Sequence, residues 1–325
     1  MKDKPKAVIA VTMTGSRRSP RGGLARLSRD IWKSRVIYML VLPGLLWYAL
    51  FVYAPMGGLT LAFKAYRANK GIMGSPWVGL ANFQNVFRDP TFPKVIARTL
   101  WINLGRLCFE FPMPVLLALM LNEIRMPRCK KVMQTVMTFP NFLSWVVVSS
   151  VLTALLSMQG PLNSVIERLG GKAVPFLGNA KIFLPMLYVS SNWKSMGWSS
   201  IIYLAAIAGV DQEQYEAAEI DGASRMQRIT RITLPNILPT VSVMLILAMG
   251  GIMSGGFDQI FNLSNAATKD VSEVLDIYIY RITFQSPPDF GFSMAISLFR
   301  SAVNLALLLI ADRGAKMMGG SGLIG

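Results

Sequence analysis

Residues 211–235 read DQEQYEAAEIDGASRMQRITRITLP, and this polar stretch separates two long apolar blocks, residues 182–210 and 237–261. Each block exceeds the roughly 20 residues that an α-helix needs to cross a bilayer core. Apolar blocks of this length form helices in lipid, because a helix satisfies its backbone hydrogen bonds internally. The stretch therefore predicts a membrane protein in which a water-exposed loop joins two spanning helices.

Four further apolar blocks extend this pattern along the chain. Hydrophobic residues make up 53% of the 325 residues and charged residues only 15%, against about 25% charged residues in an ordinary soluble domain. We predict an all-α polytopic membrane protein with about six transmembrane helices. A transmembrane domain is expected at residues 36–315, between a basic N-terminal tail of residues 1–35 and a short C-terminal tail of residues 316–325. The predicted spans are residues 36–63, 100–121, 132–156, 182–210, 237–261 and 291–311.

The distribution of the basic residues along the chain is explained better by membrane topology than by nucleic-acid binding. Lys and Arg number 33 against 17 Asp and Glu, which gives a formal net charge of +16. With the N-terminus in the cytoplasm, the cytoplasmic segments hold 19 basic residues and the external segments hold 11. Membrane proteins carry such an excess of Lys and Arg in their cytoplasmic loops. We therefore expect both termini and the loop of residues 211–236 in the cytoplasm.

Most enzyme chemistry is disfavoured by what the sequence lacks. There is no histidine, the commonest general base and metal ligand. Cys108 and Cys129 do not have CxxC spacing, so we expect neither a zinc site nor a disulfide framework. Gly171-Lys172 lacks the earlier glycine of a phosphate-binding P-loop and is followed by Ala173. We therefore expect no catalytic residue, no metal and no cofactor in this chain.

The polar stretch predicts a short, capped helix. Asp211 can cap its N-terminus, with Gln214 three residues on as in a capping box, and Gly222 can end it. About ten residues lie between them, for a helix some 15 Å long. A helix this short is not stable alone and needs a partner surface. That surface belongs either to this chain or to another subunit.

The residue pattern resembles the EAA loop of ABC importer permeases. Glu216-Ala217-Ala218, Gly222 and Ile232-Thr-Leu234-Pro235 fit its spacing without a gap. Other segments resemble the polysaccharide and complex-oligosaccharide branch of the carbohydrate-uptake permeases, and more narrowly the alginate-oligosaccharide importers. They are Leu42-Pro-Gly, residues 74–83 (GSPWVGLANF), residues 118–125 (ALMLNEIR) and Gly160-Pro-Leu-Asn. The sequence departs from that family at two positions. It has Ser297 where the family has Gly, and Arg300 where the family has Lys.

The resemblance implies a coupling role for the loop and a set of partners. The helix would dock in a cleft of a separate ATPase subunit, which would hold the ATP and Mg²⁺. A second permease, most readily in a heterodimer, two ATPase copies and an extracytoplasmic solute-binding protein would complete an inner-membrane importer working by alternating access. The implied coupling residues are Glu213, Tyr215, Glu216, Ala217, Ala218, Asp221, Gly222, Leu234 and Pro235.

Two polar and aromatic clusters are candidates for the substrate path. Sugars are bound by aromatic rings together with amide and charged side chains, and charged groups inside a membrane mark pathways. These clusters equally fit interfacial aromatics and polar contacts between helices. We interpret Arg106 and Glu110 as a structural pair one helical turn apart. The candidate path residues are Asn192, Trp193, Lys194, Phe257, Asp258, Gln259, Asn262 and Arg300.

The predicted function is the transmembrane subunit of an ATP-driven, binding-protein-dependent importer of oligosaccharide or polysaccharide. Lys194 and Arg300 favour an acidic sugar. The alternative is an ATP-independent secondary transporter or channel for a polar solute. Such carriers often show inverted repeats and intramembrane carboxylates, and the sequence has no clear repeat and few acids in its spans. The EAA-like loop favours the importer, because an ATP-independent carrier does not need it.

Overall fold

The computed structural model describes residues 32–285, 287–317 and 322, and these divide into two units at Leu59 and Thr60. The first unit is apolar helix: α2 (Arg35–Tyr48), the π-helical η2 (Ala49–Tyr53) and the start of the 3-10 helix η3 (Ala54–Phe63). No residue of the apolar window in Arg35–Phe63 is buried. A helix that is apolar on all sides is typical of a membrane span. Of the predicted N-terminal tail, residues 1–31 lie outside the described residues.

The second unit is a bundle of helices joined by short helical turns. Within the described residues it contains no strand, only an isolated bridge between Lys64 and Trp77, so the all-α prediction is confirmed. The larger helices are α4 (Ala81–Arg88), α5 (Thr91–Phe109), α6 (Pro112–Asn122), α7 (Pro127–Thr138), α8 (Trp145–Leu156), α9 (Pro161–Arg168), α10 (Ala180–Ala208), α11 (Gln212–Ile220), α13 (Leu234–Gly250), α14 (Phe257–Leu263), α16 (Leu275–Phe284) and α17 (Phe290–Met317). The short elements are α3 (Gly71–Gly74), η4 (Phe139–Phe142), α12 (Arg225–Arg228), the π-helical η5 (Ile229–Thr233) and α15 (Lys269–Ser272).

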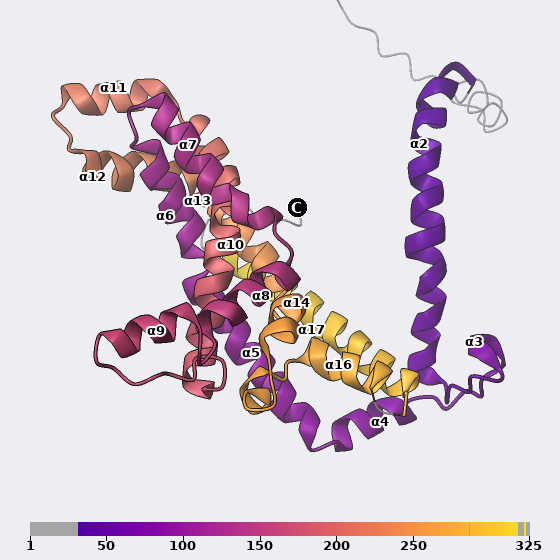
Figure 1. Cartoon of the computed structure of the whole chain (residues 1–325). Coiled ribbons are helices and arrows are strands. Elements are labelled where there is room, and N and C mark those ends of the chain that lie inside the picture. Colours follow the sequence, from indigo (N-terminus) through magenta and orange to yellow (C-terminus); the bar gives the residue numbers. More distant parts are fainter. Residues whose placement is uncertain (1–31, 286, 318–321, 323–325) are drawn as a thin grey trace, which may run out of the picture. The chain divides into compact units, whose positions relative to one another are not determined.

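The long helix α10 organises this unit. It contacts α5, α6, α7, α13 and α14, and α13 also packs along α17. Gly197 allows α10 to approach α7 closely, because a Cβ there would overlap the backbone of Met137 and Thr138. Figure 1 shows α11 and α12 at one end of the unit and α4 and α16 at the other. The bundle therefore has one end formed by the polar loop and an opposite end formed by the turns around α14–α16.

Five helical segments are long and apolar enough to cross a membrane. They are Arg35–Phe63, Thr91–Asn122, Trp145–Arg168, Arg225–Gly250 and Phe290–Met317. The predicted span at residues 182–210 corresponds to α10, which has 29 residues but carries too many polar groups to meet the same hydropathy criterion. All six predicted blocks therefore contain helix, and five of them meet the criterion for a span.

The predicted bounds of two spans were wrong. The block 132–156 is not one helix, because the 3-10 turn η4 at Pro140 separates α7 from α8. The block 237–261 is also divided, since α13 ends at Gly250 and α14 starts at Phe257. Gly255 and Gly256 have positive φ values of 112° and 81°, a conformation that only glycine adopts without strain. Glycine content therefore ends this span about ten residues earlier than hydropathy indicates.

Candidate functional site

The polar loop forms the short helix that its sequence predicts. The Asp211 side chain accepts a hydrogen bond from the Glu213 N–H at 3.0 Å, which caps the N-terminus of α11. At the other end Gly222 has a φ of 76°. Its N–H donates to the Glu219 carbonyl at 3.1 Å, and the Ala223 N–H donates to the Ala218 carbonyl at 2.8 Å. These two bonds form a Schellman motif, so α11 has a defined end as well as a defined start.

One detail of the predicted cap was wrong. The Gln214 side chain does not return to the Asp211 backbone, because its Oε1 accepts a hydrogen bond from Asn236 Nδ2 at 3.1 Å. A complete capping box is found instead in the next turn, between Ser224 and Gln227 at the start of α12. Gln214 therefore links two helices where the sequence pattern predicts a local bond.

Three side-chain contacts fasten α11 to the segment that leads into α13. The Tyr215 and Thr233 hydroxyls share a hydrogen bond of 2.8 Å. Gln214 is bonded to Asn236 as described above, and Arg228 forms an ion pair of 3.2 Å with Glu219. We call α11, α12, η5 and the first turn of α13 the coupling bracket. These contacts join both halves of the loop and connect α11 to the start of α13.

The remaining coupling candidates lie on the surface of the bracket. Glu213, Glu216, Ala217 and Asp221 are exposed, and the neighbouring Ile220 is 87% exposed. Ala218 and Leu234 are half-buried, and Pro235 is exposed at the start of α13. A single exposed apolar side chain is ordinary on a protein surface, so the exposed face of α11 is distinguished by its carboxylates and small residues.

The structure places the predicted path residues of α10 in contacts between helices. Lys194 Nζ donates to the Asn141 carbonyl at 2.8 Å and lies 5.7 Å from the centre of the Trp145 ring. Asn192 Nδ2 donates to the Phe109 carbonyl at 3.2 Å. Trp193 is 47% exposed. Lys194 and Asn192 therefore hold α10 against η4 and α5.

Of the path residues predicted in and around α14, only Gln259 is buried in a polar network. Its Nε2 donates to the Leu187 carbonyl at 2.8 Å and to Ser190 Oγ at 2.9 Å. Its Oε1 accepts from Arg106 Nη2 at 2.5 Å. Asp258 and Asn262 are exposed instead.

The other two predicted path residues do not join this network either. Phe257 stacks on Phe261 with ring centres 5.2 Å apart. Arg300 is ion-paired with Asp276, which also accepts a hydrogen bond from the Gly255 N–H at 3.2 Å. The eight predicted residues therefore do not form one site.

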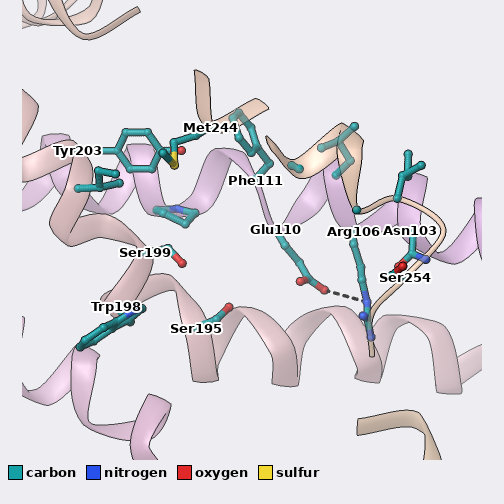
Figure 2. Close-up of a pocket in the computed structure, with 16 residues that line it drawn as sticks. Asn103, Arg106, Glu110, Phe111, Ser195, Trp198, Ser199, Tyr203, Met244 and Ser254 are labelled. Atoms are coloured by element: carbon teal, nitrogen blue, oxygen red, sulfur yellow. Dashed lines mark ion pairs between the residues drawn. The ribbon is translucent and has the colours of Figure 1, made fainter. Parts of the chain in front are cut away.

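A polar cavity of about 520 Å³ lies between α5, α6, α10 and α13. Figure 2 shows Arg106 and Glu110 side by side on its wall. Arg106 Nε lies 3.6 Å from Glu110 Oε1, and Glu110 Oε2 accepts a hydrogen bond from Ser191 Oγ at 2.8 Å. The two residues pair on one helix face, as the sequence predicts, and they also line this cavity and bond to Gln259 and Ser191 of neighbouring helices. The cavity is further lined by Asn103, Ser195, Trp198, Ser199, Tyr203, Met244, Ala248 and Ser254, among others.

Three buried polar atoms at this cavity lack a hydrogen-bond partner within the described part of the chain. They are Asn103 Nδ2, Arg106 Nε and Glu110 Oε1. Buried polar atoms are normally satisfied by protein or water. Arg106 Nε and Glu110 Oε1 lie 3.6 Å apart in the ion pair. Of the three atoms, Asn103 Nδ2 is therefore the one whose surroundings favour a bound water or hydroxyl group. The sequence signal for this site was the charged pair inside an apolar block, which marks pathways in membrane proteins.

The geometry of the structure by itself indicates a class of protein. A helical chain with membrane-length apolar segments, a polar cavity between its helices and an exposed helix fastened to one of the cavity helices has the architecture of a membrane transport component. Residues 112–314 match the family described as binding-protein-dependent transport system inner membrane component. The chain belongs to this family, and it is therefore an inner-membrane permease component of a binding-protein-dependent ABC transport system.

Proteins similar to this chain include sugar permeases. The chain is 40% identical over 299 residues to the polygalacturonan/rhamnogalacturonan transport system permease protein YteP of Bacillus subtilis (strain 168), a match that covers 92% of this chain and 93% of that one. A crystal structure of a bacterial alginate ABC transporter, in complex with an alginate pentasaccharide-bound periplasmic protein, contains a similar chain. Identity to that chain is 36% and the TM-score is 0.83, with 92% of this chain and 100% of that chain covered. These findings favour the importer over the ATP-independent carrier.

Proposed function

We propose that this chain is the transmembrane subunit of an importer for acidic oligosaccharides, driven by a separate ATPase that contacts the coupling bracket. The observation that carries the proposal is the exposed, doubly capped helix α11, fastened to α13 by Tyr215 and Gln214. A membrane chain that only formed a pore would not need this external element. The acidic substrate is supported by two similar proteins, a polygalacturonan/rhamnogalacturonan permease and a transporter that imports the acidic polysaccharide alginate.

The bracket offers a direct mechanical route to the cavity. ATP-driven closure of the ATPase would displace α11, and the bonds to Thr233 and Asn236 would carry that displacement into α13. The same helix lines the cavity with Met244 and Ala248. A shift of α13 therefore changes the cavity wall, which is what alternating access to a substrate site requires.

The cavity chemistry fits a saccharide. Arg106, Glu110 and Asn103 offer charged and amide groups, and the hydroxyl groups of Ser195 and Ser199 line the same space. Trp198 adds an aromatic surface. A site that uses aromatic contact for affinity and a few polar groups for orientation is typical for small ligands. We therefore place the membrane part of the sugar path here, in addition to the predicted path residues on α10, α14 and α17.

The proposed assembly contains this chain, a second permease in a heterodimer, two ATPase copies and an extracytoplasmic solute-binding protein. ATP and Mg²⁺ would bind to the ATPase. Both termini and the coupling bracket would face the cytoplasm, in keeping with the larger number of basic residues on that side. The bracket residues Glu213, Glu216 and Asp221 would face the ATPase as exposed carboxylates.

The proposal is tested with the complete complex reconstituted in lipid vesicles. We expect Glu216→Lys to leave insertion and assembly intact but to abolish the stimulation of ATP hydrolysis by binding protein loaded with trigalacturonate. The matched control is Glu167→Lys, which reverses an exposed carboxylate on α9. Full stimulation and uptake with Glu216→Lys would contradict the coupling role. Uptake of uronates without any ATP hydrolysis by the wild-type complex would contradict the importer itself.

A further inference from the structure

A second hollow lies at the end of the bundle opposite α11. It has a volume of about 320 Å³ and is formed by α14, α15 and α16. α13 begins beside α11 and ends at Gly250, so the segments that follow it lie at its far end. Asn265 beside the hollow donates from Nδ2 to the Leu177 carbonyl at 2.6 Å, which places the loop after α9 at the same end. On the proposed topology this end faces the outside, where substrate arrives.

Two members of a row of aromatic side chains, Phe261 and Tyr280, line one side of the hollow, and Phe257 and Phe284 extend the row beyond it. Phe257 and Phe261 are stacked, and Tyr280 packs against Phe261 with a distance of 5.1 Å between ring centres. Phe284 continues the row at 5.3 Å from Tyr280. Phe261 is 40% exposed and Phe284 is 68% exposed. The row therefore presents aromatic surface to a ligand, and such surface provides much of the contact area in small-molecule sites.

Polar and basic groups complete the wall. Lys269, Gln285, Ser264 and the Tyr280 side chain line the hollow, and Lys269 has no ion-pair partner within the described residues. The acidic residue of the lining is Glu273, which is buried and ion-paired with Arg281. The pair is charge-neutral, so Lys269 leaves the wall with a net positive charge. A net positive wall favours an anionic ligand.

Arg281 is held in place from two sides. Its guanidinium group is ion-paired with Glu273 and lies 5.5 Å from the centre of the Tyr278 ring. The Tyr278 hydroxyl in turn donates a hydrogen bond to Asp89. Burial alone would raise the pKa of Asp89, but the hydrogen bonds from Tyr278 and Thr91 and the charge of Arg281 outweigh it and lower the pKa. Asp89 therefore stays ionised, and the basic side of the hollow is fixed before a ligand arrives.

We propose that this hollow is an entry subsite that binds a uronate residue of the incoming oligosaccharide, with the sugar ring against Phe261 and Tyr280 and the carboxylate near Lys269. This inference rests on the proposed function, because it takes the substrate to be an acidic saccharide. The volume lies at the lower end of the roughly 300–1,000 Å³ usual for ligand sites. The subsite would hold one end of the chain while the rest enters the cavity lined by Arg106.

The test measures binding of trigalacturonate to the complete importer in lipid nanodiscs, without the binding protein, by saturation-transfer NMR. We expect transfer to trigalacturonate, and at least threefold less transfer to it in Lys269→Met and in Phe261→Ala. Neutral maltotriose should receive less transfer than trigalacturonate in the wild type. The matched control is Lys172→Met, which removes an exposed lysine from the loop after α9. Both changed side chains are on the surface, and thermal melting of each variant complex checks that it remains folded.

Three outcomes would overturn the subsite. The first is no saturation transfer to trigalacturonate in the wild-type complex, and the second is equal transfer in all variants. The third is a loss of affinity for unloaded binding protein in Lys269→Met that equals the loss of transfer, which would show that Lys269 contacts protein instead of sugar. Aromatic residues that merely anchor the helix in the interface would give the second outcome. Failure of the proposed function is a separate result: binding protein loaded with uronate would not stimulate ATP hydrolysis even in the wild type.

Discussion

Replacing Gly222 by valine tests whether the end of α11 matters for coupling. Gly222 has a φ of 76°, and a Cβ added there would meet no heavy atom within 4 Å. The substitution therefore creates no steric overlap with the rest of the protein. Its whole effect acts on the backbone of the cap, where the Gly222 and Ala223 N–H groups bond to the Glu219 and Ala218 carbonyls.

The size of the effect follows from the left-handed conformation. Such a conformation costs an L-residue about 1–2 kcal/mol, and a β-branched residue is a stronger outlier there. A free-energy change of this size alters the ratio of two states by about 5- to 30-fold. Opening the last turn of α11 releases this strain but breaks the two cap hydrogen bonds, each of which contributes roughly 0.5–1.5 kcal/mol to the closed turn. We therefore expect the last turn of α11 in Gly222→Val to be open for a large fraction of the time.

The assay is ATP hydrolysis by the reconstituted complex, with and without loaded binding protein. We expect Gly222→Val to lower the stimulated rate severalfold, and Gly222→Asn to stay near the wild-type rate because Asn enters the left-handed region more readily. Gly170 is a matched control at the end of α9, with a φ of 84° and equally open surroundings. It has the same type of cap, because its N–H donates to the Glu167 carbonyl at 3.0 Å and the next N–H to the Ile166 carbonyl at 2.9 Å. Wild-type coupling in Gly222→Val, or an equal loss in Gly170→Val, would refute the reasoning.

Two further substitutions probe the packing around the polar network. Gly256→Ala should lower the melting temperature of the complex and its uptake rate, because the new Cβ would overlap the Arg106 guanidinium group; unchanged melting would contradict the close approach. Arg300→Met should destabilise the chain by about 1–3 kcal/mol, since it leaves the half-buried Asp276 carboxylate without its cation. Adding Asp276→Asn should restore part of the melting temperature. A loss of uptake with no change in stability would instead identify Arg300 as a path residue.

The coupling loop could be predicted from sequence because its structure is local. Asp211 caps the nearest N–H groups, and Gly222 adopts the one backbone conformation that favours glycine. Both signals act within one helical turn and do not depend on the rest of the fold. The prediction failed only where a distant partner competed, at Gln214, which bonds Asn236 of the next helix. Sequence patterns describe local bonds well and cannot rank them against tertiary ones.

The cavity could not be predicted for the same reason. Arg106 meets Gln259 across 153 residues of sequence, and this pairing depends on the turn at Gly255 and Gly256 that ends α13 early. Hydropathy continued the span to residue 261, which would have put Gln259 on an ordinary helix face. Because the predicted end of this span was about ten residues too late, the sequence did not predict the contact that joins α5, α10 and α14 beside the cavity.

The position of the bracket bonds indicates how force enters the membrane part. Tyr215 is bonded to Thr233, one residue before Leu234, and Gln214 is bonded to Asn236, one residue after Pro235. Thr233 ends the π-helical turn η5, and such turns often occur at functional sites. Pro235 lies in the first turn of α13, where the helix tolerates a residue without a backbone N–H. α11 is therefore bonded to residues on both sides of Leu234-Pro235, and under the proposed function a push on α11 would act on the chain both before and after this dipeptide.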